Sequence, residues 1–499
     1  MRLTDLLGTA ELDGAKVTVH PAGGERRPGT PGAGGPLASD PLVSDVVIAS
    51  AEVTPGALFG CVKGMRADGH DFAAEAVARG AVAMLCERAV DVPVPQVLVP
   101  SVRRALGPVS AALWSRPSSS MKVVGVTGTN GKTTTCALLA AIFEAEGWRT
   151  GVIGTLTGER TTPEAPTLQR RFAEFRDQGA GAVAMEVSSH ALDQYRVSGT
   201  DFAAGVFTNL SQDHLDYHGT MEAYLEAKAQ LFTRGQVRLA VVNRSDAWGA
   251  RLVERLAGGD VPLVTFATED ATEVVMRRRT ASFSWRGGRL ELNMAGRFNV
   301  VNAVAAATTA RELGAGWDAV AKGLASVCPV RGRFEAIDNG QPFSVLIDFA
   351  HTPAAIAEAL RAARELTTEG RVIIVFGAGG DRDKAKRPAM GRVASELADV
   401  VVVTSDNPRS EKPLTIISEV AAGVKGTGPL IDVDRARAIA SAIGMAQPGD
   451  VVLVAGKGHE TGQDFGDHVE PFDDAEVARQ ALAQRSYGGD AVYGKARRP

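Results

Sequence analysis

Short runs of apolar residues, each ended by a polar or Gly-rich turn, recur along this chain and predict β-strands. In the first part of the chain they occupy residues 44–50, 58–62 and 81–85, with a helical pattern over 73–79. The polar, Pro-containing stretch 114–120 then marks a domain boundary.

From residue 122 onward, apolar runs alternate with helical patterns. Strands are predicted at 122–126, 182–186 and 205–207, with a helix over 132–146. Alternation of this kind predicts a parallel sheet with helices on both faces. A third part begins near Gly332, with strands predicted at 344–347, 371–376, 400–403 and 451–454. With 499 residues, the chain is long enough for about three domains, which we place at 1–115, 116–333 and 334–499.

Composition argues against two classes of protein, those that bind nucleic acid and those that bind or span a membrane. The net charge of −4 gives no general attraction for nucleic acid or for an anionic membrane surface. The N-terminus lacks a long apolar stretch, and no later apolar run approaches the ~20 residues that cross a bilayer, so we expect a cytoplasmic protein. The four cysteines are scattered without metal-site spacing. Residues 21–40 are so rich in Gly and Pro that we expect a loop.

A phosphate-binding loop is indicated at Gly125-Val-Thr-Gly-Thr-Asn-Gly-Lys-Thr133, between a predicted strand and a helix. The backbone N–H groups of such a loop and the start of the helix bind phosphate, a lysine neutralises the terminal phosphates, and a hydroxyl reaches Mg²⁺. Gly128, Gly131, Lys132 and Thr133 fit these parts. An ordinary glycine turn is the weaker interpretation, because Lys-Thr-Thr-Thr follows a buried strand.

Two side chains at neighbouring strand ends are candidate ligands of a second cation. Glu186 ends one predicted strand and His214 follows the next, so a carboxylate and an imidazole could share a metal that bridges phosphate and substrate. Taken alone, each is more often a structural residue. Lys228 lies in an amphipathic helix, where a single lysine is normally a solvated charge.

In the third part, polar and charged residues follow two successive strands. They are Arg382, Lys384, Lys386 and Arg387 after the first, and Asp406, Asn407 and Arg409 after the second. Guanidinium groups bind carboxylates, and an Asp–Asn pair can accept from an ammonium, so the set suits a zwitterionic amino acid. A solvated basic run is the alternative.

These motifs, taken in order, resemble those of the Mur ligase family over almost the whole chain. The matching stretches are 128–134, 161–164, 186–192, 208–218, 296–299 with Asn302, 332–335, 348–353, 379–383 and 456–460. Within the family, Asp-Asn-Pro-Arg at 406–409 is similar to the signature of members that use diaminopimelate.

The resemblance implies an α/β fold of three domains: a small N-terminal α/β domain for the UDP moiety, a central P-loop-type ATPase with a mainly parallel sheet, and a C-terminal Rossmann-like domain for the amino acid. It implies catalytic roles for Lys132, Glu186, His214 and Lys228, and metal ligation by Thr133, Glu186, His214 and a carbamylated Lys228. The nucleotide would contact Gly128, Thr129, Asn130, Gly131, Lys132, Thr133, Thr134, Asn302, Arg333 and Asp348. The UDP-linked substrate would contact Ser50, Thr161, Thr162, Ser188, Gln194 and Arg196, although the family's usual Asp-Ser-Arg is Ala49-Ser50-Ala51 here. Diaminopimelate would contact Arg387, Asp406, Asn407, Pro408, Arg409, Gly456 and Glu460.

The implied activity is that of an ATP-dependent amide-bond ligase that uses Mg²⁺ and adds diaminopimelate to UDP-MurNAc-L-Ala-D-Glu through an acyl phosphate. We expect small-molecule substrates, no nucleic-acid or membrane partner, and a monomer. The alternatives are another ligase of the same family, which residues 406–409 disfavour, and a catalytically silent nucleotide-binding regulator, which the intact Lys132, Glu186, His214 and Lys228 disfavour. A P-loop kinase or motor ATPase would not need the amino-acid pocket.

Overall fold

The computed structural model describes residues 1–10, 12, 18–20, 40–64, 67–158, 160–233, 235–426 and 428–485. The expected loop at 21–40 therefore lies outside the described residues, apart from Asp40. The chain divides into two compact units. The first comprises Met1–Leu210, Glu222–Ala267 and Val304–Gly323; the second comprises Ser211–Met221, Thr268–Ala303 and the chain from Leu324 onward.

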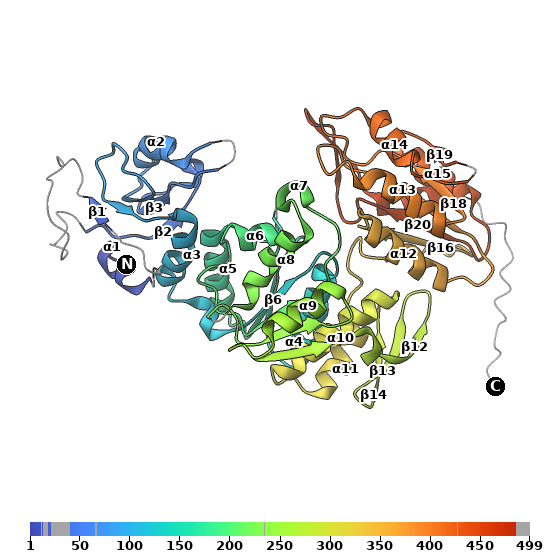
Figure 1. The fold of residues 1–499 in the computed structure, drawn as a ribbon, viewed down its shortest axis with the longest axis horizontal. Coiled ribbons are helices and arrows are strands. Elements are labelled where there is room, and N and C mark those ends of the chain that lie inside the picture. The colour runs from blue at the N-terminus through green and yellow to red at the C-terminus, as the bar shows by residue number, and fades with distance from the viewer. Residues whose placement is uncertain are drawn as a thin grey trace, which may run out of the picture. The chain divides into compact units, whose positions relative to one another are not determined.

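The first unit opens with an α/β sheet of strand order β1-β5-β4-β3-β2 (Figure 1). Strands β2 to β5 run parallel, and β1 pairs antiparallel with β5. The apolar side chains of the strands face α1 and α3 in one buried cluster, and α2 in another. The elements are α1 (Leu3–Thr9), β1 (Thr18–His20), β2 (Asp45–Val47), β3 (Ala57–Gly60), α2 (Ala73–Ala78), β4 (Ala83–Cys86), β5 (Gln96–Leu98) and α3 (Val102–Leu113), with 3₁₀ turns at Ser50–Glu52, Gly69–Phe72 and Pro117–Ser120.

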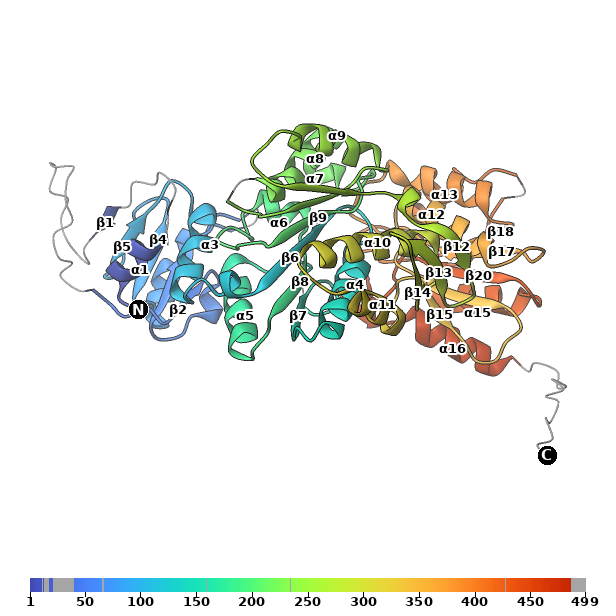
Figure 2. The ribbon, with the colours of Figure 1, turned by 90° about the horizontal axis from the view of Figure 1, so that it is seen from below.

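The same unit contains a second sheet, whose strands run parallel in the order β11-β10-β9-β6-β8-β7 (Figure 2). Strands β6, β8 and β9 are buried almost throughout, as strands covered on both faces must be. The elements are β6 (Lys122–Thr127), α4 (Lys132–Ala145), β7 (Thr150–Ile153), α5 (Ala165–Asp177), β8 (Ala182–Glu186), α6 (Ser189–Asp193), β9 (Ala204–Phe207), α8 (Met221–Ala229), β10 (Ala240–Asn243), α9 (Ala247–Leu256) and β11 (Leu263–Phe266), with a 3₁₀ turn at Gln230–Phe232.

The second unit contains an antiparallel sheet of order β12-β13-β14, which the sequence patterns did not predict. Strand β14 alternates exposed and buried residues, β13 is mostly buried, and β12 is largely exposed. The elements of this region are α7 (Leu215–His218), β12 (Thr272–Met276), β13 (Ala281–Trp285) and β14 (Gly288–Leu292), with a 3₁₀ turn at Thr268–Asp270. The helices that follow, α10 (Arg297–Glu312) and α11 (Trp317–Ser326), are divided between the two units, because residues 304–323 belong to the first.

The last sheet has the order β15-β16-β20-β17-β18-β19, parallel except for β15. Successive residues of its strands point to opposite faces. Ile374 and Phe376 pack with α12, α13 and α14, whereas Ile373 and Val375 pack with α15 and α16. The elements are β15 (Glu335–Ile337), β16 (Ser344–Asp348), α12 (Pro353–Glu365), β17 (Val372–Phe376), α13 (Lys386–Leu397), β18 (Val400–Val403), α14 (Pro413–Ala421), β19 (Leu430–Ile431), α15 (Arg435–Met445), β20 (Val451–Ala455), β21 (Gly462–Asp464), β22 (Val469–Pro471) and α16 (Asp474–Gln484).

The α/β class and the parallel sheets expected from the sequence are confirmed, and the predicted strands at 182–186 and 400–403 have the bounds of β8 and β18. Cys61, Cys86 and Cys136 are buried, and Cys328 is exposed. Among the described helices, none has the length and apolar character needed to cross a bilayer.

Candidate active site

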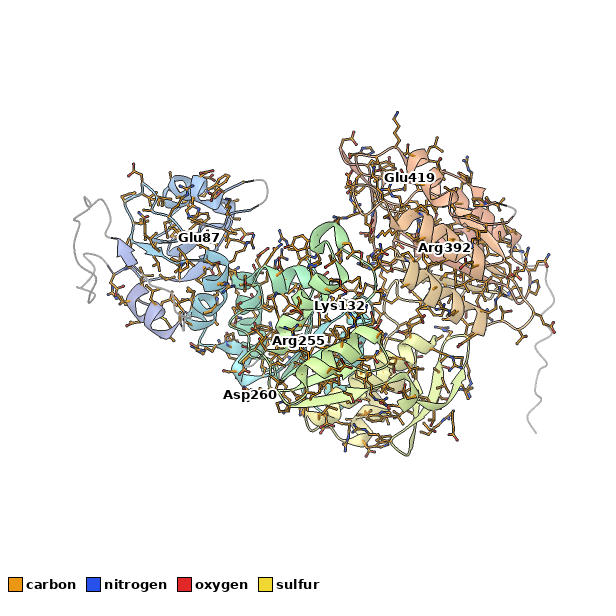
Figure 3. All side chains as sticks on the ribbon, viewed as in Figure 1. Glu87, Lys132, Arg255, Asp260, Arg392 and Glu419 are labelled. Carbon is orange, nitrogen blue, oxygen red and sulfur yellow. The ribbon has the colours of Figure 1, made fainter. Side chains whose placement is uncertain are left out.

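The phosphate-loop candidate connects β6 to α4, as predicted. Gly128 has φ +147°, and a side chain there would collide with the hydroxyl of Thr208. Gly131, with φ +84°, forms the N-cap of α4. Both glycines therefore meet a backbone or space requirement that other residues do not. Lys132, labelled in Figure 3, donates from Nζ to the carbonyls of Gly128 (3.0 Å) and Thr129 (2.8 Å).

The loop is held from the side by two residues that follow β9. The Thr208 hydroxyl donates to the Asn130 carbonyl at 2.6 Å. The side-chain oxygen of Asn209 accepts from the Asn130 N–H at 3.0 Å, and the backbone carbonyl of Asn209 accepts from the Thr129 N–H at 2.9 Å. In the sequence, 208–218 is identified as a stretch that matches the family and contains the candidate ligand His214, but its pattern did not predict that Thr208 and Asn209 hold the loop.

Glu186 lies at the carboxyl end of β8 and faces the start of α4. Its Oε1 accepts from the hydroxyl of Thr133 (3.0 Å) and from the N–H of Thr155 (2.8 Å), and its side chain is buried. Gly154 leaves the space for this carboxylate, because a Cβ there would collide with it. A hydroxyl and a carboxylate that converge in this way fit Mg²⁺, which takes few protein ligands when phosphates supply the others. Among the described residues there is no cluster of three or more His, Cys, Asp or Glu side chains that could hold a metal.

Lys228 is buried on α8, with a relative exposure of 1%. Its ammonium donates to the Gly128 carbonyl at 2.8 Å and lies 4.7 Å from the centre of the Tyr224 ring. The solvated-charge alternative is therefore wrong. Burying an ammonium is costly unless the group is paired or hydrogen-bonded, and ionisable groups in such environments cluster at functional sites.

His214 belongs to the second unit, where it has a left-handed backbone (φ +54°). Its Nε2 lies 3.5 Å from Asp213, whose other histidine neighbour is His351 at 3.6 Å. Burial alone would raise the pKa of Asp213, but His351, His214 and Lys386 hold it well below its usual range. Asp213 is therefore an ionised anchor for both histidines. The shared cation of Glu186 and His214 stays a prediction.

Four of the residues expected to contact the UDP-linked substrate lie close together near the carboxyl end of β8, in the first unit: Thr162, Ser188, Gln194 and Arg196. Thr162 donates from its hydroxyl to the Glu186 carbonyl (2.9 Å) and accepts from the Ser188 N–H (3.1 Å). Arg196 donates to Gln194 (2.8 Å) and lies 3.1 Å from Glu164. Because Thr162 is buried, its contacts place it as a support for the others. The remaining candidates are Thr161, with its hydroxyl 3.1 Å from that of Thr155, and Ser50, half-buried at the start of a 3₁₀ turn.

The expected nucleotide contacts Asn302, Arg333 and Asp348 lie in the second unit. Asp348 accepts from the N–H groups of Phe334 and Ala350, both at 2.8 Å. Burial raises the pKa of Asp348 against the opposing charge of Arg333. Their role toward a nucleotide stays a prediction.

Three strand ends of the last sheet bring together the amino-acid-binding candidates. Asp406 and Asn407 follow β18, Gly456 and Glu460 follow β20, and the loop after β17 reaches Arg409, whose Nη1 donates to the Gly380 carbonyl at 2.6 Å. Pro408 lies between Asn407 and Arg409. Gly456 has φ +115° and leaves space for the Asp406 carboxylate, with which a Cβ would collide.

Arg387 does not fit the role that the sequence suggested. Its side chain is fully buried, and its terminal nitrogens donate to Glu411 (2.8 and 3.0 Å), to Glu419 on α14 (2.6 Å; labelled in Figure 3) and to the Gly379 carbonyl (3.1 Å). Arg387 also holds the pKa of Glu411 well below its usual range. A ligand carboxylate would have to displace these partners, so the structure corrects Arg387 to a support of the loops. Arg382, from the same basic run, is exposed and its Cγ lies near Gly379, as does the Arg409 guanidinium.

Comparison with known proteins agrees with these motifs. Family models match residues 43–116 (Mur ligase family, catalytic domain), 126–310 (Mur ligase middle domain) and 332–458 (Mur ligase, glutamate ligase domain). The chain belongs to the Mur ligase family. The resemblance inferred from the sequence is thereby confirmed.

Individual relatives of this Mur ligase share most of its length. It is 45% identical over 463 residues to the UDP-N-acetylmuramoyl-L-alanyl-D-glutamate--2,6-diaminopimelate ligase of Geobacillus kaustophilus, covering 87% of this chain and 94% of the relative. The enzyme of the same name from Aquifex aeolicus is 42% identical over 466 residues, with coverages of 89% and 94%. A solved structure titled as such a ligase matches with a TM-score of 0.63 and 31% identity, covering 88% of this chain and 95% of the other.

Proposed function

We propose that this Mur ligase joins 2,6-diaminopimelate to the D-glutamyl carboxylate of UDP-MurNAc-L-Ala-D-Glu at the expense of ATP. The observation that supports this proposal most strongly is a set of groups at the edge of the last sheet. The Arg409 guanidinium and the Asp406 and Glu460 carboxylates lie there on neighbouring loops. This set offers a donor for carboxylates and acceptors for ammonium groups, as a two-ended amino acid requires. The relatives named for this reaction support the assignment.

In the first step, an oxygen of the D-glutamyl carboxylate attacks the γ-phosphorus of ATP. The bond to the β,γ-bridging oxygen breaks, ADP leaves, and an acyl phosphate forms. Two anions must approach each other, so the Lys132 ammonium at the start of α4 lowers the barrier by offsetting their repulsion. Thr133 and Glu186 would hold Mg²⁺, which supplies further positive charge at the phosphates.

In the second step, the neutral amine of diaminopimelate attacks the acyl carbon, and a tetrahedral intermediate forms. The carbon–oxygen bond to phosphate breaks, the amide forms, and the nitrogen loses its proton. Arg409, Asp406, Asn407 and Glu460 orient the amino acid for this attack. The binding energy at its far end is used to place one amine beside the carbonyl.

The remaining assignments are also proposals. Thr161, Ser188, Gln194, Arg196 and Ser50 bind the UDP-linked substrate, and Thr162 supports them. Asn302, Arg333 and Asp348 contact the nucleotide. Lys228 would act as a carbamate, and His214 with Glu186 would hold a second Mg²⁺. We further propose a cytoplasmic monomer with domains at 1–115, 116–333 and 334–499, and no nucleic-acid or membrane partner.

The test is ADP release with UDP-MurNAc-L-Ala-D-Glu, ATP and Mg²⁺ in the presence of a panel of amino acids. We expect turnover with a diaminopimelate isomer, and at least about 10³-fold lower kcat/KM with lysine, because lysine lacks the second carboxylate that the half-buried Arg409 guanidinium would bind. The panel contains the meso and LL isomers, ornithine and D-Ala-D-Ala. Comparable turnover with lysine, or turnover only with D-Ala-D-Ala, would refute the proposal.

A further inference from the structure

Lys457 is a buried lysine that the mechanism above does not use. It follows β20, and its side chain has no exposed surface. A buried ammonium is unfavourable unless it is paired and hydrogen-bonded. Here Nζ donates to Oδ1 of Asn407 at 2.8 Å and to Oε2 of Glu460 at 3.1 Å. Both partners are proposed ligands of the amino acid.

These contacts fix which way the amide of Asn407 points. Its Oδ1 accepts from the Lys457 ammonium and from the backbone N–H of Asp464 at 3.0 Å. Its Nδ2 donates to the Glu460 carboxylate at 2.7 Å. A flipped amide would set its NH₂ group against two groups that can only donate, and its oxygen against a carboxylate that can only accept. The observed orientation is therefore the one that chemistry allows.

The orientation decides what Asn407 can offer to a ligand. Both acceptor sites of Oδ1 are used, and one N–H of the amide binds Glu460, so the second N–H is what remains for a ligand. The sequence suggested that Asn407 accepts from an ammonium, and the structure corrects this: Asn407 donates, and a donor selects a carboxylate.

The same lysine sets the role of Glu460. Oε2 receives hydrogen bonds from Lys457 and Asn407, which leaves Oε1 to accept from an ammonium. The side chain of Glu460 is 34% exposed, so the free oxygen lies where a ligand can reach it. The positive charge of Lys457 also balances one of the two negative charges, Asp406 and Glu460, beside the ligand.

We propose, on the basis of the function proposed above, that Lys457 is a positioning residue for diaminopimelate. It holds the Asn407 amide as a donor toward a carboxylate of the amino acid and holds Glu460 as an acceptor for its ammonium. Lys457 acts through these two side chains and does not touch the substrate.

The first test replaces Lys457 with Met, which has a similar length but neither charge nor donor. We expect the KM for diaminopimelate to rise about 10- to 100-fold, the range for losing hydrogen bonds to charged groups. The KM values for ATP and for UDP-MurNAc-L-Ala-D-Glu should stay within about twofold, because their proposed ligands are elsewhere. Lys425→Met is the matched control, since Lys425 is an exposed lysine of the same sheet region, paired with Glu396; its kinetics should equal those of the parent.

A double-mutant cycle then asks whether Lys457 acts through Asn407. In an Asn407→Ala background, Lys457→Met should raise the KM for diaminopimelate clearly less than it does in the parent, because one of the two side chains that it positions is gone and only its contact with Glu460 is left to lose. Lys457→Gln keeps a neutral donor and should give a KM between those of the parent and the Met variant. If Lys457→Met does not fold, the cycle is run with Lys457→Gln.

The outcomes separate the two proposals. Fully additive effects in the cycle, or a rise in the KM for ATP equal to that for diaminopimelate, would overturn the positioning role while the parent's use of diaminopimelate still stands. If the parent does not use diaminopimelate at all, the proposed function itself fails.

Discussion

Breaking the buried ion pair between Arg435 and Asp474 should destabilise the last sheet and its loops. Both side chains have no exposed surface, and they form two hydrogen bonds of 2.7 Å. Burial opposes the charge of Arg435, but Asp474 outweighs it and raises the pKa of the guanidinium. Asp474→Asn keeps the shape of the side chain and leaves a buried guanidinium without its counter-charge.

The expected cost is about 3–5 kcal/mol, the range for removing one partner of a buried pair. That is a large fraction of the ~5–15 kcal/mol that stabilises a typical domain. Replacing both residues with apolar ones, Arg435→Met with Asp474→Leu, should recover most of this loss, because no charge then stays buried alone. It should not restore substrate affinity. Arg435 also donates to the carbonyls of Ser405 (3.2 Å) and Ala455 (3.0 Å), which directly precede the ligand loops at Asp406 and Gly456.

Hydrogen exchange measured by mass spectrometry is the suitable assay, because all five tryptophans precede residue 318 and their fluorescence would miss this region. In Asp474→Asn, amides of β18, β20 and α15 that exchange by unfolding should lose about 10²-fold or more of their protection, while β6 and β8 serve as the internal control. In the double variant protection should return, but the KM for diaminopimelate should stay raised. Protection within about tenfold of the parent in Asp474→Asn, or a double variant as unprotected as the single one, would refute the reasoning.

Four further outcomes are expected. Lys132→Ala should abolish ligation with only a small change in the thermal unfolding of the protein, since it removes a charge and two hydrogen bonds at the start of α4 but no core packing; activity within about twofold of the parent at saturating ATP would contradict the phosphate-loop role. Lys228→Ala should lose most activity, and intact-protein and peptide mass spectrometry of the active parent should find a carbamate on Lys228; an unmodified lysine in a fully active sample would exclude it. Arg409→Ala should raise the KM for diaminopimelate steeply and leave the KM for ATP unchanged. In competition kinetics, the variant's preference for diaminopimelate over lysine should be smaller than that of the parent; an unchanged preference would show that Arg409 is not the specificity residue. Burial and the charges of Arg333 and Arg331 lower the pKa of His459 to about 4. Between pH 6.5 and 4 the unfolded chain therefore binds more protons than the folded protein does, and the free energy of unfolding falls as the pH falls. His459→Gln should flatten this pH dependence in denaturant titrations, and an unchanged dependence would show that another group causes it.

Local patterns in the sequence were sufficient for the parallel strands and the phosphate loop. Buried strands such as β8 and β18 are short apolar runs with polar ends, and the run alone marks both bounds. The loop before Lys132 is defined by glycine spacing within seven residues. The sheet β12-β13-β14 was missed although residues 281–285 and 289–292 alternate apolar and polar side chains, as half-buried strands do; only β12, which is largely exposed, gives no such signal.

Residue roles that depend on partners far along the chain needed the tertiary structure. Arg387 and Arg382 lie five positions apart in one basic run, yet Arg387 is buried against Glu411 and Glu419 while Arg382 is exposed. The sequence pattern around Lys228 predicts a surface charge on its helix. Only the tertiary structure, which packs Lys228 against Gly128, 100 residues earlier, shows that it is buried.

The sequence by itself determined the α/β class, the family and the strand ends that carry the chemistry, because these follow from short-range periodicity and motif spacing. Tertiary structure alone decided which charges are left for ligands. Burial and hydrogen-bond partners come from segments that are distant along the chain, as when Lys457, Asp464 and Glu460 together set the direction of the Asn407 amide. A side chain's polarity is encoded locally, but its remaining hydrogen-bonding capacity is set by the neighbours that folding provides.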